Sequence, residues 1–88
     1  MENVDKEDKK HHSVVILVNE QPVTITQKEA TAVEIKTAAK AQGVHIEINF
    51  LLIEELPNGT SKNIGDNDPP IHIREHLKFT AIAPDDNS

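Results

Sequence analysis

The sequence predicts an α+β domain in which one amphipathic helix packs across a mixed sheet of four to five strands. Three observations predict this class. Apolar, β-branched runs occur at residues 13–18, 47–56 and 77–83, which is typical of strands. Between the first two runs, apolar residues recur at spacings of three and four, as on one face of a helix. The chain has 88 residues, enough for one domain with a thin core.

The first strand and the segment after it predict a hairpin. Residues 13–18 (SVVILV) are apolar almost throughout, which suits a strand covered on one face and partly on the other. Residues 19–22 (NEQP) are turn formers, and residues 23–26 (VTIT) alternate with period two. We therefore expect a turn at 19–22 and a return strand at 23–26.

The helix is predicted at residues 32–42. Thr31 and Glu34 have the spacing of a capping box, in which each side chain satisfies a backbone N–H of the other residue. Gly43 stands where the end of a helix favours a positive φ. The face predicted to meet the sheet is rich in alanine, so the helix can approach the sheet closely while adding little volume. Its residues are Ala32, Ile35, Ala38, Ala39 and Gln42.

The second half of the chain predicts three more strands. Residues 47–56 (EINFLLIEEL) form a strongly apolar strand, which Asn58-Gly59 ends in a tight turn. Residues 61–64 read as a short edge strand, and residues 65–70, which end in two prolines, as an irregular connection. Residues 77–83 form the last strand. If it lies parallel to the first strand, the order of elements is that of a β-grasp fold.

Alternation along the central strands predicts an exposed apolar cluster. The positions expected to face the helix are Ile48, Phe50 and Leu52 on one strand and Leu77, Phe79 and Ala81 on the last. Leu51, Ile53 and Ile82 then point to the other face of the sheet, where they can form a partner-docking patch. Two alternatives are a cover supplied by the chain ends or loops, and a shifted register.

Composition excludes several classes of partner. The formal charge is −6, from 15 acidic and 9 basic residues, so no basic face for nucleic acid is visible. The only aromatic residues besides histidine are Phe50 and Phe79, too few for a base-stacking platform. No apolar run is long enough to span a membrane. Cysteine is absent, which fits a reducing compartment, so we expect a soluble cytoplasmic protein.

The two ends of the chain read as tails. Residues 1–12 (MENVDKEDKKHH) and 84–88 (PDDNS) contain too little apolar surface to offset the entropy of ordering them. We therefore expect a domain at residues 13–83 between two flexible tails.

No catalytic, metal-binding or cofactor-binding site is predicted. No histidine–acid pair is spaced to activate a hydroxyl, and Glu54 and Glu55 are adjacent on a strand, so they point to opposite faces. His72 and His76 are four residues apart, but the segment runs into a strand, so we interpret them as surface histidines. The chain is therefore not expected to be an enzyme.

In its order of predicted elements the chain resembles ubiquitin and its bacterial relatives over residues 13–83. The likeness rests on the element order, on Thr31-x-x-Glu34, on Asn58-Gly59 and on Gly65-Asp66 before the last strand. More narrowly, SVVILVNEQPVTIT, TAVEIKTAAKAQG, NGTSKNIGDND and LKFTAIA are similar to bacterial multiubiquitin domains. Those domains are encoded beside proteins resembling activating enzymes, conjugating enzymes and peptidases, in operons linked to phage defence.

The resemblance implies a protein modifier that an adenylating enzyme activates at its C-terminus and a conjugating enzyme passes to target proteins, after a peptidase processes it. The alternatives are a non-covalent adaptor of the same fold and, in a third class, an antitoxin-like inhibitor. By the same resemblance Lys36 matches a buried lysine of ubiquitin that faces a carboxylate, whereas most lysines in mid-helix are solvated.

One departure from the family concerns the conjugation tail, for which the residues are Pro84, Asp85, Asp86, Asn87 and Ser88. Ubiquitin-like modifiers and sulfur carriers usually end in Gly-Gly, so sulfur carriage is disfavoured. Three interpretations stay open. The chain is trimmed or truncated, its partner's channel accepts a polar tail, or the domain is never conjugated.

Overall fold

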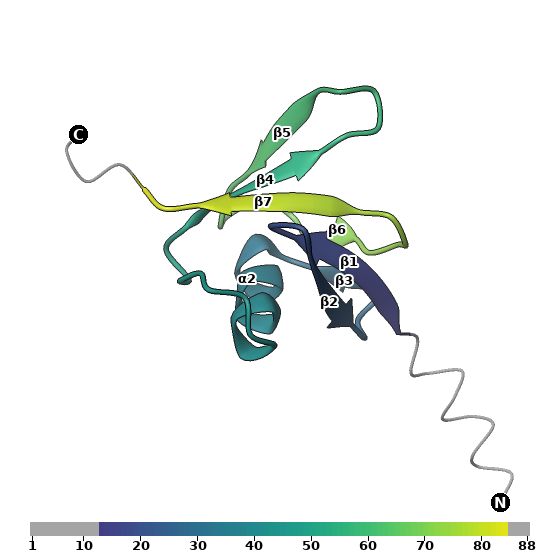
Figure 1. Cartoon of the computed structure of the whole chain (residues 1–88). Helices are drawn as coiled ribbons and strands as arrows, with labels where there is room; N and C mark the ends of the chain where they lie inside the picture. The colour runs from purple at the N-terminus through teal and green to yellow at the C-terminus, as the bar shows by residue number, and fades with distance from the viewer. Residues whose placement is uncertain (1–12, 85–88) are drawn as a thin grey trace, which may run out of the picture.

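In the computed structural model, which describes residues 13–84, five strands form one mixed sheet and helix α2 packs across one of its faces (Figure 1). The strands in spatial order are β2 (Gln21–Ile25), β1 (Val14–Val18), β7 (Lys78–Ile82), β4 (Leu51–Glu55) and β5 (Ser61–Ile64). Strand β1 and the central strand β7 are parallel, and the other neighbours are antiparallel. The predicted α+β class and the β-grasp arrangement are confirmed.

The β1–β2 hairpin is tighter than predicted. Its loop consists of Asn19 and Glu20 alone, at φ values of 53° and 67°, which is the left-handed pair that a two-residue hairpin turn requires. The return strand therefore begins at Gln21 rather than at residue 23. Pro22 lies inside β2, which is possible because β2 is an edge strand and needs no N–H from that position.

Helix α2 (Ala32–Ala41) begins and ends as the sequence indicates. The Thr31 hydroxyl accepts a hydrogen bond from the Glu34 N–H at 3.2 Å, and the Glu34 carboxylate accepts one from the Thr31 N–H at 2.8 Å. The capping box is thus complete. Gly43 has a φ of 105°, which releases the chain from the helix at little steric cost.

The core lies between α2 and the facing side of the sheet. On the last strand Phe79 and Ala81 are buried while Lys78 and Ile82 are exposed, which confirms the predicted alternation. Leu77, just before β7, is buried as well. The largest apolar side chains that are almost fully buried come from strands β1, β2, β4 and β7 and from the helix. They are Phe79, Ile16, Ile25, Ile35, Leu52, Val18 and Val23.

The predicted strand at 47–56 begins four residues late. Residues 47–50 form a turn, in which the Phe50 N–H donates to the Glu47 carbonyl at 3.0 Å. Ile48, predicted to face the core, is instead 37% exposed, and Phe50 is only partly buried. Two earlier residues, Val44 and Ile46, are buried and pack into the core before the turn, and only at Leu51 does the chain enter the sheet.

A second sheet, absent from the sequence-based prediction, consists of β3 (Glu29–Ala30) and β6 (Ile71–His72). Each strand has two residues, too few to show a period. The Ile73 N–H also donates to the Lys28 carbonyl at 2.8 Å, which extends the pairing by one bond. This small ladder ties the segment before the helix to the connection before β7.

Candidate protein-interaction face

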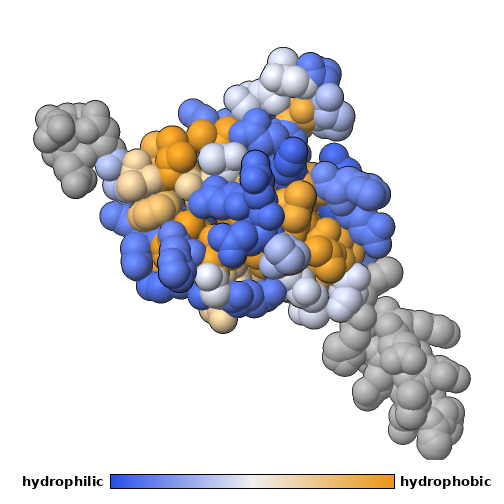
Figure 2. All heavy atoms as spheres, viewed as in Figure 1, coloured by the Kyte–Doolittle hydropathy of each residue, from blue (hydrophilic) through white to orange (hydrophobic). Residues whose placement is uncertain are grey.

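The face of the sheet opposite α2 carries an apolar patch, which we define as Leu51, Ile53 and Ile82. Leu51 and Ile82 are paired across β4 and β7, with 53% and 44% of their surface exposed. Ile53, two residues further along β4, is half-buried opposite Thr80 of β7. The sequence placed all three residues on this face, and the structure brings them together. Figure 2 shows hydrophobic surface gathered near the end of β7.

Polar groups lie along one side of this patch. The Thr80 hydroxyl donates to the Glu55 carboxylate at 3.0 Å across the two strands. Asn63 of β5 lies opposite Ile53. Glu54, by contrast, is buried on the other face, so the two adjacent carboxylates point apart as predicted. An apolar centre with a polar rim is the usual anatomy of a protein-binding surface.

The chain leaves the sheet next to the patch, and Asn19 fixes the point of departure. Strand β1 ends at Val18, but the Asn19 N–H still donates to the Phe79 carbonyl at 3.0 Å. The Asn19 side-chain amide then continues the ladder. Its Oδ1 accepts from the Ala81 N–H at 2.8 Å, and its Nδ2 donates to the Ala81 carbonyl at 3.2 Å. Ala81 is thereby held as if β1 were longer.

The predicted conjugation tail lies almost wholly outside the described residues. Pro84 is described and is half-buried, two residues beyond Ile82. Asp85, Asp86, Asn87 and Ser88 lie outside the described range, as do residues 1–12. The predicted tail can therefore be placed only by its point of attachment, which is the end of β7 beside the patch.

Lys36 is buried, so the solvated alternative is wrong for this residue. Only 2% of it is exposed, and its Nζ donates to the Phe50 carbonyl at 2.8 Å and to the Asp66 carboxylate at 2.9 Å. These bonds join the helix, the turn before β4 and the connection after β5. The sequence offered Lys36 as a candidate for burial but did not identify Asp66 as its partner.

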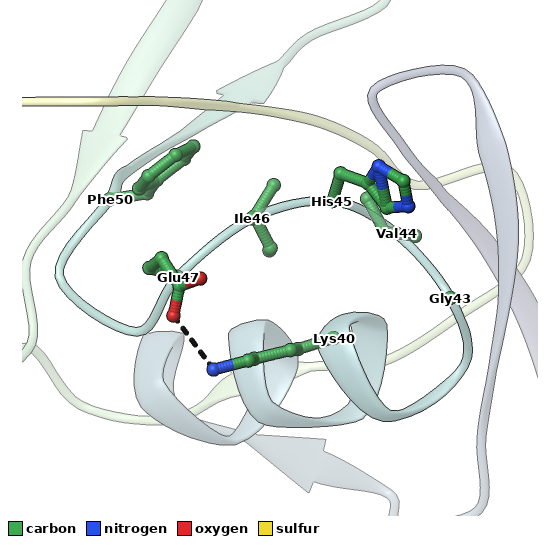
Figure 3. Close-up of a pocket in the computed structure, with 7 residues that line it drawn as sticks. All are labelled: Lys40, Gly43, Val44, His45, Ile46, Glu47 and Phe50. Atoms are coloured by element: carbon green, nitrogen blue, oxygen red, sulfur yellow. Dashed lines mark hydrogen bonds and ion pairs between the residues drawn. The ribbon is translucent and has the colours of Figure 1, made fainter.

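Several open hollows lie on the surface formed by residues 13–84. One of about 430 Å³ lies where α2 turns into the next segment (Figure 3), where Lys40 pairs with Glu47 at 2.7 Å. Its other lining residues are Gly43, Val44, His45, Ile46 and Phe50. Both members of the ion pair are about half exposed or more, which is typical of a surface contact.

The two spaced histidines do not converge on a ligand site. His72 lies in β6 and His76 in the turn before β7, at a φ of 74°, and both are exposed. Within residues 13–84 no group of three or more potential metal-ligating side chains lies close enough to hold an ion.

Helix α2, the helix within residues 13–84, has ten residues and is too short to cross a membrane.

Two amides that bond to the sheet, Asn19 at the end of β7 and Gln42 at the β2 edge, were not identified from the sequence. Asn19 was assigned to a turn and Gln42 to the helix, yet both side chains bond to strand backbone far away in sequence. No local pattern indicates such partners.

Comparison with protein-family models, with curated proteins and with solved structures finds no match to this chain.

Proposed function

We propose that this domain is a ubiquitin-like protein modifier of a bacterial conjugation pathway. In this proposal an activating enzyme and a conjugating enzyme bind the apolar patch, and the segment that follows Pro84 enters their active sites. The domain supplies recognition and an acyl group and takes no catalytic part itself. The observation that carries the proposal is the position of the patch, because Leu51 and Ile82 lie at the point where the chain leaves the sheet.

The geometry suits delivery of a chain end. β7 lies between β1 and β4, so the last strand is held on both sides up to Ala81, partly by Asn19. Ile82 and Ala83 are exposed. A partner that covers Leu51 and Ile82 therefore meets the departing chain at a fixed position, which reduces the entropy lost when the chain enters a channel.

The chemistry proposed is acyl activation followed by two transfers. A terminal carboxylate attacks the α-phosphorus of ATP, pyrophosphate leaves, and an acyl adenylate forms. A cysteine thiolate of the activating enzyme then displaces AMP and gives a thioester, which passes by thiol exchange to the conjugating enzyme. Finally, a target amine attacks the thioester carbonyl, the thiol leaves and an amide remains. ATP supplies the driving force, and no oxidant or reductant is needed.

Purified chain, incubated with an adenylating protein of the kind encoded beside the domains that it resembles, ATP and magnesium, tests this proposal. We expect ATP-dependent pyrophosphate release and a thioester that is sensitive to reducing agent, both detected on the native C-terminus by intact mass. Leu51→Asp should reduce adduct formation at least tenfold, because a charge in the patch excludes an apolar partner. Lys28→Asp, a charge change away from the patch, is the matched control. Absence of adenylate with the native end would contradict the proposal.

A second candidate is a non-covalent adaptor, favoured by the exposed patch alone. An adaptor needs Leu51 and Ile82 but not the segment after Pro84. Removing residues 84–88 distinguishes the two functions, because partner binding measured by calorimetry stays unchanged for an adaptor while adducts disappear for a modifier. The third class, an antitoxin-like inhibitor that presents its acidic surface, predicts binding that weakens strongly in high salt.

A further inference from the structure

The two edges of the five-stranded sheet differ in what their backbones offer. An edge strand presents N–H and C=O groups that can pair with another strand, and proteins usually block such edges. The sheet ends in β2 on one side and in β5 on the other, where Figure 1 shows no further element beside β5. Which groups are free on each edge follows from the alternation of an antiparallel ladder.

The β2 edge is closed by two residues. The Thr24 N–H donates to Gln42 Oε1, and Gln42 Nε2 donates to the Thr24 carbonyl, both at 2.8 Å. The backbone of Thr24 therefore points away from β1, as does that of Pro22 two residues earlier. Pro22 has no N–H to offer. Both donor positions on this edge are thus occupied or absent.

On the β5 edge, no described residue pairs with the outer side of the strand. The Leu56 N–H donates to the Thr60 carbonyl at 2.8 Å, so residues 56 and 60 form a hydrogen-bonded pair. Since such pairs alternate along the β4–β5 register, Glu54 and Lys62 form the next one. Ser61 and Asn63 then direct their backbone groups outward. The same alternation directs the backbone of Phe79 toward β1, where its carbonyl accepts from Asn19, so the assignment is consistent across the sheet.

The open edge is accessible and short. All of residues 60–63 are exposed. Beyond Asn63 the next outward position is Gly65, whose N–H donates to the Asp68 carboxylate at 2.8 Å and whose carbonyl accepts from the Asp68 N–H at 3.1 Å. The free stretch thus ends at Asn63, and it can pair with only a few residues of an added strand.

We propose that the β5 edge binds an extended segment of another protein by strand addition, with an acidic residue of that segment opposite Lys62. Strand addition uses backbone hydrogen bonds for affinity and side chains for specificity. Lys62 supplies the specificity. It is exposed at the middle of the edge, and neither ion pair found within residues 13–84 involves it.

A second copy of the chain is a poorer occupant, because its charge is wrong. Symmetric antiparallel pairing of two β5 edges matches Ser61 of one copy with Asn63 of the other and uses all the free groups. It also places the two Lys62 side chains directly opposite each other, and like charges at such positions destabilise a sheet. An acidic residue in a foreign strand gives the favourable pair instead. This inference stands apart from the modifier proposal, since it uses a different surface.

A blocked seven-residue peptide in which threonine and valine alternate, with glutamate at the centre, tests the proposal on the full chain. Titration followed by amide NMR should slow hydrogen exchange at Ser61 and Asn63 and leave Thr24 unchanged. The same peptide with lysine at the centre should bind about fivefold more weakly, as expected for exchanging an attractive cross-strand pair for a repulsive one. Lys62→Glu should invert that preference.

Asn63→Pro removes one outward N–H without removing a bond of the β4–β5 ladder, just as Pro22 does in β2, and it should abolish peptide binding. Asn63→Ala keeps the N–H and should bind as the parent chain does. Equal binding of the glutamate and lysine peptides, no binding of either, or unaltered binding by the proline variant would overturn the proposal. Protection of Ser61 and Asn63 that rises with protein concentration alone would overturn it too, in favour of a second copy.

Discussion

At the scale of single residues, Lys36 combines a charge with an apolar environment. Its stem is buried among core residues, while Nζ reaches the Phe50 carbonyl and the Asp66 carboxylate. The two partners are not equivalent. Asp66 is 53% exposed, so water screens that ion pair, whereas the carbonyl lies in the turn that brings the chain into β4.

Lys36→Met should therefore destabilise the fold by about 1–3 kcal/mol, because it keeps most of the buried stem but removes the donor to a partly buried carbonyl. Asp66→Asn is the matched variant and should cost less than about 1 kcal/mol, since the pair on that side is half exposed. Urea unfolding followed by circular dichroism measures both. Equal losses of unfolding free energy in the two variants would show that Lys36 stabilises the fold through the Asp66 carboxylate and not through the Phe50 carbonyl.

At the scale of elements, the β1–β2 turn stabilises the far end of β7. The Asn19 side chain replaces the missing next residue of β1 in the parallel ladder. A side-chain amide has the same donor and acceptor as a peptide group, so it can bond to both backbone groups of Ala81. The last strand is thus paired almost to the point where the chain leaves the sheet.

Asn19→Gly isolates this contribution, because glycine keeps the positive φ of 53° without strain and removes only the amide. We expect a loss of about 1–3 kcal/mol for two hydrogen bonds. Amide exchange at Ala81 should accelerate more than exchange at Leu52. Glu20→Gly, at the neighbouring positive φ, is the control and should leave Ala81 protected. Unchanged protection of Ala81 in Asn19→Gly would refute the role of the amide.

Helix α2 and strand β4 show what local sequence can predict. The helix was predicted within one residue because its start and end signals, Thr31-x-x-Glu34 and Gly43, act locally. Strand β4 was predicted to begin at residue 47 instead of Leu51, because Ile48 and Phe50 continue the apolar pattern of the strand. Tertiary contacts decide that segment, and Ile48 is left outside the core. The Asn19 and Gln42 bonds span 62 and 18 residues, so no short window contains both partners.

At the scale of the whole molecule, the two faces of one sheet differ in what they contact. Its inner face and α2 enclose the core, while its outer face carries the patch that the sequence anticipated from alternation alone. Adjacent leucines belong to different faces: Leu52 is 1% exposed and Leu51 is 53% exposed. The alternation therefore predicts opposite consequences for two neighbouring substitutions.

Leu52→Ala should destabilise the domain by about 2–5 kcal/mol, because it leaves a cavity in the core. Leu51→Ser should change stability by less than about 1 kcal/mol, because its side chain already contacts water. Thermal and urea unfolding of both variants measure the difference. A large loss for Leu51→Ser would mean that another part of the chain covers the patch, which was the alternative left open by the sequence.

The parallel pairing of β1 and β7 has a mechanical consequence. Because both strands run in the same direction, the start of β1 and the end of β7 lie at opposite ends of the sheet (Figure 1). Tension applied between residues 13 and 84 shears this ladder along its length and loads the bonds at Leu17 and Asn19 together. Such a pull must break these bonds nearly simultaneously, whereas peeling strand β5 from its hairpin breaks one bond at a time.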